Sequence, residues 1–341
     1  MKGPLIVLDE IAGRKAAAFL KDGVLDDFLI APADDAPPAP GAIYRAIADR
    51  PLKGQGGMIL RLPDGQTALF RNAKGLAAGQ AMLVQVTSYA EPQKAVPVTD
   101  RLIFKGRSVI VTPGASGVNI SRQIKDEEAR VRLMDAVHMS RIESAAHGLI
   151  VRSAAVDHDD EDIAEETAQL LDLADAVLAD KDREPELLVD APDPHELAWR
   201  DWPTAETVHG FEDHGVLDAL PALDSIQVDL KDGSLFLEPT RALIAVDVNT
   251  GGDFSPAAGL KANLACARAL PRQLRLRGLG GQITLDLAPM AKKDRRQFEQ
   301  TLRAAFKADP VETALVGWTP LSHFELQRKR ERLPLPKGLV S

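Results

Sequence analysis

The chain has 341 residues, 45% of them hydrophobic and 27% charged, a composition typical of a soluble globular protein with roughly two or three domains or subdomains. Its only cysteine, Cys266, excludes an internal disulfide framework and a zinc site built from several cysteines. A net charge of −9, taken alone, argues against nucleic-acid binding, because phosphate binding needs a basic surface. The N-terminal apolar run is too short for a signal peptide, and no run reaches the ~18 apolar residues of a membrane helix, so we expect a cytoplasmic protein that does not contact membranes.

The charges are unevenly distributed. Acidic residues are concentrated in 157–186, and basic residues in 268–278, 292–297 and 328–332. An acidic protein of this kind can still present a positive groove, although solvated helix faces explain each basic run equally well. The acidic stretch is a candidate docking surface for a basic protein partner.

The first hundred residues predict β-structure. Residues 4–33 predict a strand and a hairpin turning at Asp22 and Gly23, and the Pro-rich stretch 32–41 predicts a linker. Residues 42–98 contain short strands separated by glycine-containing turns, which predicts a small barrel or sandwich.

The middle of the chain predicts a mixed α/β region. In order, we expect one or two strands over 101–114, a helix over 125–145, a strand over 147–156 and an amphipathic helix over 162–181. The stretch 184–224 is rich in Pro, Asp and His and predicts no clear element.

Strands and helices alternate in the C-terminal part, which predicts an α/β core with a parallel component. The expected elements are a hairpin turning at Asp232 and Gly233, a strand over 242–250, a helix over 255–278 interrupted or restarted at Pro271, a strand over 279–290, a helix over 292–309, a strand over 312–322 and a terminal helix over 323–334.

Two of these strands carry an acid inside an apolar run. Asp247 and Asn249 share one face of the first strand, and Asp286 lies between two leucines in the second. If the strands are neighbours, the two carboxylates converge, and burying them unpaired would be costly. A divalent cation would remove this cost, and oxygen ligands favour Mg²⁺, with Mn²⁺ as the alternative. Asn249 is then placed to orient a carboxylate, while the competing interpretation is a pair of acids that cap neighbouring helices.

Other motifs are weaker. The glycines of 278–282 precede a strand rather than follow one, which does not fit a dinucleotide-binding loop. Arg152 and Ser153 end an apolar strand, and a guanidinium beside a hydroxyl can bind an anion, although an arginine at such a place is often only a surface residue.

Several segments together resemble the ribonuclease E/G family. The pattern consists of D-x-N-T at 247–250, N-L at 263–264, R-Q-L-R-L-R-x-L-G-G at 272–281 and then the strand with Asp286. Residues 40–100 resemble the RNA-binding OB-fold barrel of this family, and H-G-L-I-V-R-S-A at 147–154 resembles the strand that leads into its 5′-phosphate sensor.

The resemblance implies an α/β fold with several subdomains. They would be a reduced ribonuclease-H-like α/β part (1–33 with 185–225), an inserted OB-fold β-barrel (34–98), a 5′-sensor-like region (99–184) and a metal-dependent catalytic α/β subdomain (226–341).

The activity implied is that of a magnesium-dependent endoribonuclease that cleaves single-stranded A/U-rich RNA by attack of a metal-activated water and leaves 5′-phosphate products. By position, Asp247 and Asp286 would hold Mg²⁺, Asn249 would orient Asp286, and Arg152 and Ser153 would bind a 5′-phosphate. The RNA-binding residues implied are Phe70 and Lys94 on the barrel surface, Arg122, and Arg275 and Arg277 at the basic helix end.

The sequence also departs from the family pattern. The cysteine pair of the family's zinc link, expected beyond the last helix, is absent before Ser341, so we expect no zinc and either a monomer or a dimer without a zinc link. Pro289 stands where many relatives have a second aspartate. Three alternatives remain open: a non-catalytic RNA-binding or ribosome-associated relative, an assembly protein that docks a basic partner, and a metal-dependent DNA phosphodiesterase.

Overall fold

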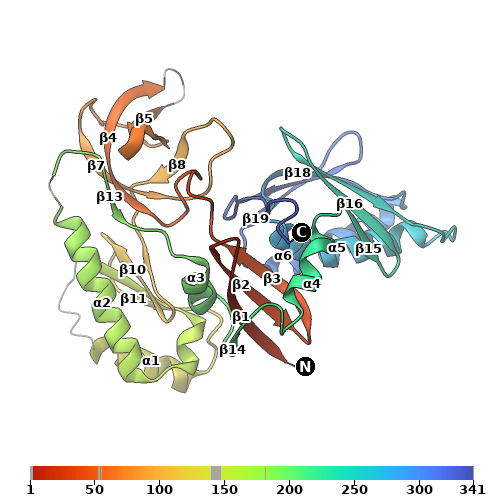
Figure 1. Cartoon of the computed structure of the whole chain (residues 1–341), viewed down its shortest axis with the longest axis horizontal. Coiled ribbons are helices and arrows are strands. Elements are labelled where there is room, and N and C mark those ends of the chain that lie inside the picture. The colour runs from red at the N-terminus through yellow and green to blue at the C-terminus, as the bar shows by residue number, and fades with distance from the viewer. Residues whose placement is uncertain (1–2, 53, 55, 140–146, 181, 341) are drawn as a thin grey trace. The chain divides into compact units, whose positions relative to one another are not determined.

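The computed structural model describes residues 3–52, 54, 56–139, 147–180 and 182–340. The chain divides into two compact units (Figure 1). Unit 1 comprises Met1–Asp34 and Glu206–Ser341, and unit 2 comprises Asp35–Ala205. Within the described ranges, no helix combines the length and the apolar character needed to cross a membrane.

Unit 2 begins with a closed, OB-like barrel of five strands, which confirms the predicted small barrel. Its strands are β4 (Ile43–Leu52), β5 (Gly57–Arg61), β6 (Thr67–Phe70), β7 (Ala81–Val86) and β8 (Val96–Thr99). The barrel closes because β4 pairs with both β5 and β7, while β6 pairs with β8 in parallel. The fully buried side chains of Ala46, Leu60, Ala68 and Val84 help to fill its interior. Strand β13 (Glu186–Val189) extends the sheet beside β4.

The rest of unit 2 is a small sheet covered by helices. Its strands, in the order β11-β12-β10-β9, are β9 (Phe104–Lys105), β10 (Val109–Pro113), β11 (Val118–Ile120) and β12 (His147–Val151). The helices are α1 (Glu127–Met139), α2 (Asp160–Leu178) and α3 (Pro194–Asp201). The α1 and α2 helices bury an apolar face against the sheet. In α2 the buried residues recur every three or four positions, as the predicted amphipathic helix requires. Residues 140–145 of the first predicted helix lie outside the described residues.

Unit 1 contains the predicted N-terminal hairpin within a four-stranded sheet. Its order is β14-β1-β2-β3, with β1 (Pro4–Ile11), β2 (Arg14–Lys21), β3 (Val24–Ile30) and β14 (Glu206–His209). Asp22 and Gly23 both have positive φ, at 53° and 77°, as a two-residue hairpin turn requires. The short helices α4 (Val216–Ala219) and η3 (Leu220–Leu223) pack against this hairpin.

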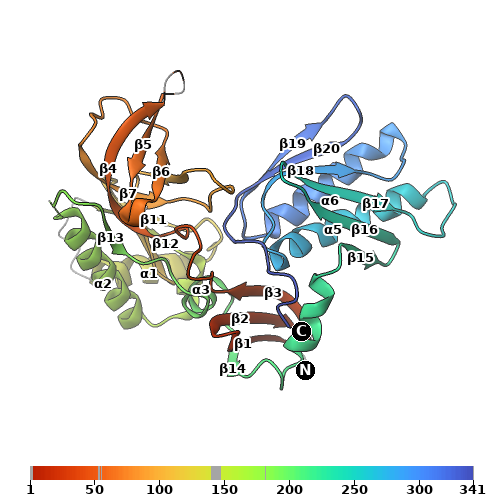
Figure 2. The same cartoon turned by 45° about the horizontal axis from the view of Figure 1, so that its top comes forward.

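The second sheet of unit 1 has six strands in the order β15-β16-β17-β18-β20-β19. They are β15 (Gln227–Leu230), β16 (Gly233–Pro239), β17 (Ile244–Asn249), β18 (Gly281–Asp286), β19 (Thr313–Trp318) and β20 (Phe324–Arg328). The predicted parallel component is the β17–β18 pair. Helices α5 (Ala258–Leu276) and α6 (Arg295–Ala308) cover one face of this sheet, and a single apolar core joins them to it (Figure 2).

Two predicted elements are wrong. Residues 323–334 do not form a helix, because Phe324, Leu326 and Arg328 are buried while Gln327 is exposed, and this period of two belongs to a strand. The α5 helix is also not interrupted at Pro271. The buried proline lies inside a continuous helix, which therefore lacks one backbone hydrogen bond at this position.

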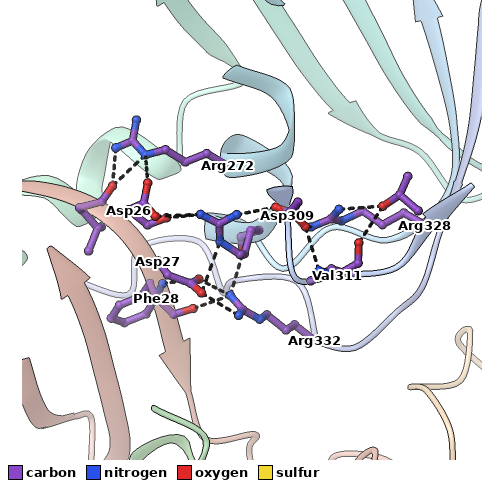
Figure 3. Close-up of polar contacts among 11 residues, drawn as sticks. Asp26, Asp27, Phe28, Arg272, Asp309, Val311, Arg328 and Arg332 are labelled. Atoms are coloured by element: carbon purple, nitrogen blue, oxygen red, sulfur yellow. Dashed lines mark hydrogen bonds and ion pairs between the residues drawn. The ribbon is translucent and has the colours of Figure 1, made fainter. Parts of the chain in front are cut away.

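A chain of buried charges joins β3, α5 and β20 within unit 1 (Figure 3). Asp309, which follows α6, pairs with Arg275 of α5 and, at 3.0 Å, with Arg328 of β20. The Arg275 side chain also lies 3.3 Å from Asp27 of β3, and both oxygens of Asp27 bind Arg332. Burial alone would raise the pKa of Asp27, but the positive charges of Arg332 and Arg275 outweigh it and hold that pKa below its usual range.

We expect Asp27→Asn to destabilise unit 1 by about 3 kcal/mol, because it removes the carboxylate paired with Arg332 and one of the two buried carboxylates beside Arg275. The neighbouring Asp26, whose side chain is 33% exposed, provides the matched control, and Asp26→Asn should cost less than about 1 kcal/mol. Urea unfolding followed by circular dichroism gives both values.

The contribution of Asp27 to stability should depend on pH. Because the folded pKa of Asp27 is lowered, this contribution is complete above the unfolded pKa of 3.8 and is lost as the pH falls through the folded pKa. The difference between wild type and Asp27→Asn should therefore shrink in acid, and a constant difference would contradict this assignment.

Candidate functional site

The two strand acids lie side by side. Strands β17 and β18 are parallel neighbours, and their register places Asp247 directly opposite Asp286. Val246, Val248 and Leu285 point to the opposite face, into the core under α5 and α6. The predicted convergence of the carboxylates is therefore confirmed. The predicted burial is wrong, because both aspartates lie on the solvent-exposed face of the sheet, and the Asp286 side chain is 69% exposed.

Asn249 orients one of these carboxylates, but not the one expected. Its side-chain nitrogen donates a hydrogen bond to Oδ2 of Asp247 at 2.8 Å. The family resemblance implied Asp286 as the partner of Asn249. Asn249 binds Asp247 instead, because the two residues lie two positions apart and therefore on the same face of β17.

A buried asparagine fixes the segment that follows Asp286. Asn263 of α5 has no exposed surface, and its amide accepts a hydrogen bond from the Ala288 backbone and returns one to the Ala288 carbonyl, at 3.0 and 2.8 Å. Gly259 allows α5 to approach this segment, since a Cβ there would lie 1.9 Å from the Pro289 carbonyl oxygen. The family resemblance included Asn263 in the motif N-L at 263–264, but no pattern in the sequence indicated that it positions the segment after Asp286.

His323, which the sequence did not indicate as a site residue, lies beside the acid pair. Nε2 of His323 is 3.6 Å from Oδ1 of Asp286. His323 immediately precedes β20, which pairs with β18, so this contact follows from a strand where the sequence predicted a helix.

The residues present fit Mg²⁺ and would supply part of its ligands. The described residues contain no cluster of three or more His, Cys, Asp or Glu side chains arranged for a metal ion. Two adjacent carboxylates are nevertheless sufficient for Mg²⁺, which commonly binds one or two carboxylates and fills its other positions with water and substrate phosphate oxygens. The hydrogen bond from Asn249 would hold the Asp247 carboxylate in a fixed orientation toward such an ion.

Arg152 and Ser153 lie in unit 2, at the end of β12. Ser153 is exposed, and the Arg152 side chain is 19% exposed and contacts Asp201 of α3 at 2.8 Å. The adjoining turn is held by Glu166 of α2, which accepts hydrogen bonds from the backbone nitrogens of Arg107 and Ser108. This contact requires Gly106, because a Cβ at that position would lie 2.4 Å from the Glu166 carboxylate.

The family model for the ribonuclease E/G family matches residues 103–211 and 204–331. The chain belongs to the ribonuclease E/G family. It is 28% identical to the ribonuclease E of Nostoc sp. over 85% of this chain and 51% of that protein. It is 30% identical to the ribonucleases G of Salmonella typhimurium and Escherichia coli strain K12, in each case over 74% of this chain and 60% of the relative. The chain thus spans between half and three fifths of the length of these curated relatives.

Two arginines that the family resemblance assigned to RNA binding are structural. Arg275 and Arg277 are only 8% and 7% exposed. Arg275 belongs to the buried charge chain, and Arg277 donates to Gln273 and to the carbonyl oxygens of residues 222 and 225. The prediction is wrong because the basic helix end joins α5 to the segments packed around it instead of facing solvent.

The barrel residues assigned by the family resemblance divide in the same way. Phe70 is 4% exposed and lies in the barrel core, so its predicted position on the surface is wrong. Lys94 is exposed, with its ammonium group beside Glu91, and Arg122 is exposed in a turn after β11. The alternation of β6 places Ala68 and Phe70 inside the barrel.

Phe70→Ala is expected to destabilise the barrel by about 3 kcal/mol, because it leaves a cavity in a packed core. Lys94→Ala should leave stability unchanged within about 0.5 kcal/mol, since that side chain is exposed. Chemical denaturation of the two variants measures the difference. Wild-type stability of Phe70→Ala would contradict the buried position of the ring.

Replacing both acids should remove divalent-metal binding and leave the fold intact. Asp247→Asn with Asp286→Asn removes two exposed charges, so we expect the free energy of unfolding to stay within about 0.5 kcal/mol of wild type. The electron paramagnetic resonance signal of Mn²⁺ reports binding directly, without a need for activity. Retention of tight Mn²⁺ binding by the double variant would show that the ion binds elsewhere.

Proposed function

We propose that the chain is a magnesium-dependent endoribonuclease that cleaves single-stranded A/U-rich RNA during RNA processing or decay. The observation that carries this proposal is the register of Asp247 and Asp286, which face each other across two parallel strands inside the segment matched by the family model. The relatives named ribonuclease E and ribonuclease G support the reaction class.

Asp247 and Asp286 would hold Mg²⁺, and Asn249 would keep the Asp247 carboxylate turned toward it. When bound, the ion neutralises charge on the attacked phosphate and lowers the pKa of a bound water. Water adds to phosphorus, the 3′-oxygen of the upstream nucleotide leaves, and the phosphate stays on the 5′-oxygen of the downstream product. His323 and Asn263 act on the same strand ends, the first beside Asp286 and the second by fixing the segment after it.

Binding of single-stranded RNA is proposed to be mainly electrostatic at the barrel. Among the described residues of the barrel region, the exposed cations are Arg50, Arg61, Arg71, Lys74 and Lys94. Cations spread over one barrel can follow a phosphate backbone without reading its sequence. Because Phe70 is buried, base stacking on that ring is not part of the proposal.

Arg152 and Ser153 are proposed to receive the 5′-monophosphate of the substrate. A guanidinium and an adjacent hydroxyl supply charge-assisted donors suited to phosphate oxygens. Arg107, held by Thr204 and His158 in the same unit, adds a further positive charge near Arg152.

Cleavage of a fluorescent single-stranded A/U-rich RNA in the presence of Mg²⁺ tests the proposal. We expect Asp247→Asn and Asp286→Asn each to lower kcat/KM by at least about a hundredfold, because each removes a ligand of the ion that stabilises the transition state. The products of the wild-type reaction should carry a 5′-phosphate.

Glu312→Gln is the matched control, because it removes an exposed carboxylate just before β19 of the same sheet. It should cleave at the wild-type rate. RNA binding by the wild-type protein without any cleavage would reject the enzyme and favour a non-catalytic RNA-binding relative. Equal cleavage of single-stranded DNA would reject the assignment to RNA.

A further inference from the structure

Asp201, the last residue of α3, lies where three cationic side chains of unit 2 converge. Its Oδ1 is 2.8 Å from Nζ of Lys105 and 2.8 Å from Nη2 of Arg152, and its Oδ2 is 2.8 Å from Nη2 of Arg200. The Asp201 side chain is 27% exposed, so solvent reaches the cluster from one side.

Three hydrogen bonds hold the guanidinium of Arg152 in this arrangement. Its Nη1 donates to the Gly106 carbonyl and, at 3.0 Å, to the Arg200 carbonyl, while its Nη2 binds Asp201. The two carbonyl contacts fix the position of the guanidinium plane. The Asp201 carboxylate accepts from Nη2, so an anionic ligand of Arg152 would compete with it for that donor.

The three cations of the cluster share one carboxylate. Lys105, Arg152 and Arg200 all contact the single carboxylate of Asp201, while the nearby Glu166 carboxylate is taken up by two backbone nitrogens of the adjoining turn. An acid in the last turn of a helix is also unfavourable toward the helix dipole, so the three cations must hold Asp201 there. Burial would raise the pKa of Asp201, but the hydrogen bonds and charges of Arg200 and Lys105 outweigh it and lower that pKa to about 2. The carboxylate is therefore ionised at neutral pH.

We propose that Asp201 takes the place of a terminal phosphate beside Arg152 and Ser153, so that RNA with a 5′-monophosphate must displace it in order to bind. This inference rests on the proposed role of Arg152 and Ser153. A phosphate monoester carries a charge of roughly −1.5 to −2 and three acceptor oxygens, so it matches three cations better than a carboxylate with one charge and two oxygens. The carboxylate compensates by belonging to the same chain, which gives it a high effective concentration. The preference for a 5′-phosphate is thus weakened but not abolished.

Binding of short 3′-fluorescein oligoribonucleotides, with either a 5′-monophosphate or a 5′-hydroxyl, tests this inference by fluorescence anisotropy. Divalent ions are left out, so that no cleavage occurs. We expect Asp201→Asn to lower the Kd of the 5′-monophosphate RNA by about tenfold, since a competing charge-assisted contact is removed. The Kd of the 5′-hydroxyl RNA should change by less than about twofold, because that end does not enter the cluster.

Asp172→Asn removes the same charge from an exposed position on α2 of unit 2, and it should leave both Kd values at the wild-type level. Arg152→Gln in the Asp201→Asn background should abolish the gain. Wild-type affinity of each variant for the 5′-hydroxyl RNA reports that it is folded, and Asp201→Ala serves as the second variant.

An unchanged ratio of the two Kd values in both Asp201 variants would overturn the inference, as would a gain that survives Arg152→Gln. The cleavage assay fails separately from this binding measurement. A wild-type protein that never cleaves RNA rejects the proposed enzyme, while the binding ratios still decide the role of Asp201.

Discussion

A chain of alternating buried charges, Arg332, Asp27, Arg275, Asp309 and Arg328, holds the N-terminal hairpin against the six-stranded sheet of unit 1. These residues come from both ends of the sequence, since β3 and β20 are separated by the whole of unit 2. Taking such charges out of water is costly, and only mutual pairing with good hydrogen-bond geometry offsets that cost. Unit 2 lies in the sequence between the two segments of unit 1, and these ion pairs connect those two segments.

The arrangement also explains why the basic runs in the sequence were a poor guide to surface charge. In 268–278, Arg275 and Arg277 are buried, and in 328–332 Arg328 and Arg332 are drawn into the same ion pairs. The acidic stretch 157–186 is likewise used internally, through Glu166 at the turn before β10 and through Asp180 and Glu186 beside Arg45. Local charge density does not say whether a charge faces solvent or a partner far along the chain.

Local signals in the sequence were sufficient for much of the fold. Turn chemistry located the hairpin at Asp22 and Gly23, glycine-spaced strands predicted the barrel, and apolar strands with single acids predicted the adjacency of Asp247 and Asp286. The failures occurred where two periods compete or where tertiary pairing decides. Residues 323–334 contain many charged residues that favour a helix, but every second side chain of Phe324–Arg328 is buried, and this segment forms a strand. The exposure of the two acids and the burial of Phe70 depend on which face of a strand meets the core, and the sequence near each residue is compatible with either face.

The open position of the acid pair has a consequence for how metal and substrate depend on each other. On the solvent-exposed face of the sheet, the proposed ion held by two carboxylates would keep most of its coordination sphere for water, so its intrinsic affinity would be modest. A phosphodiester that supplies further oxygens would strengthen that binding, and by linkage the ion would strengthen binding of the phosphodiester by the same factor. The proposed metal centre would then be formed by protein and polynucleotide together, and the fraction of protein molecules with a bound ion would rise with the amount of RNA present.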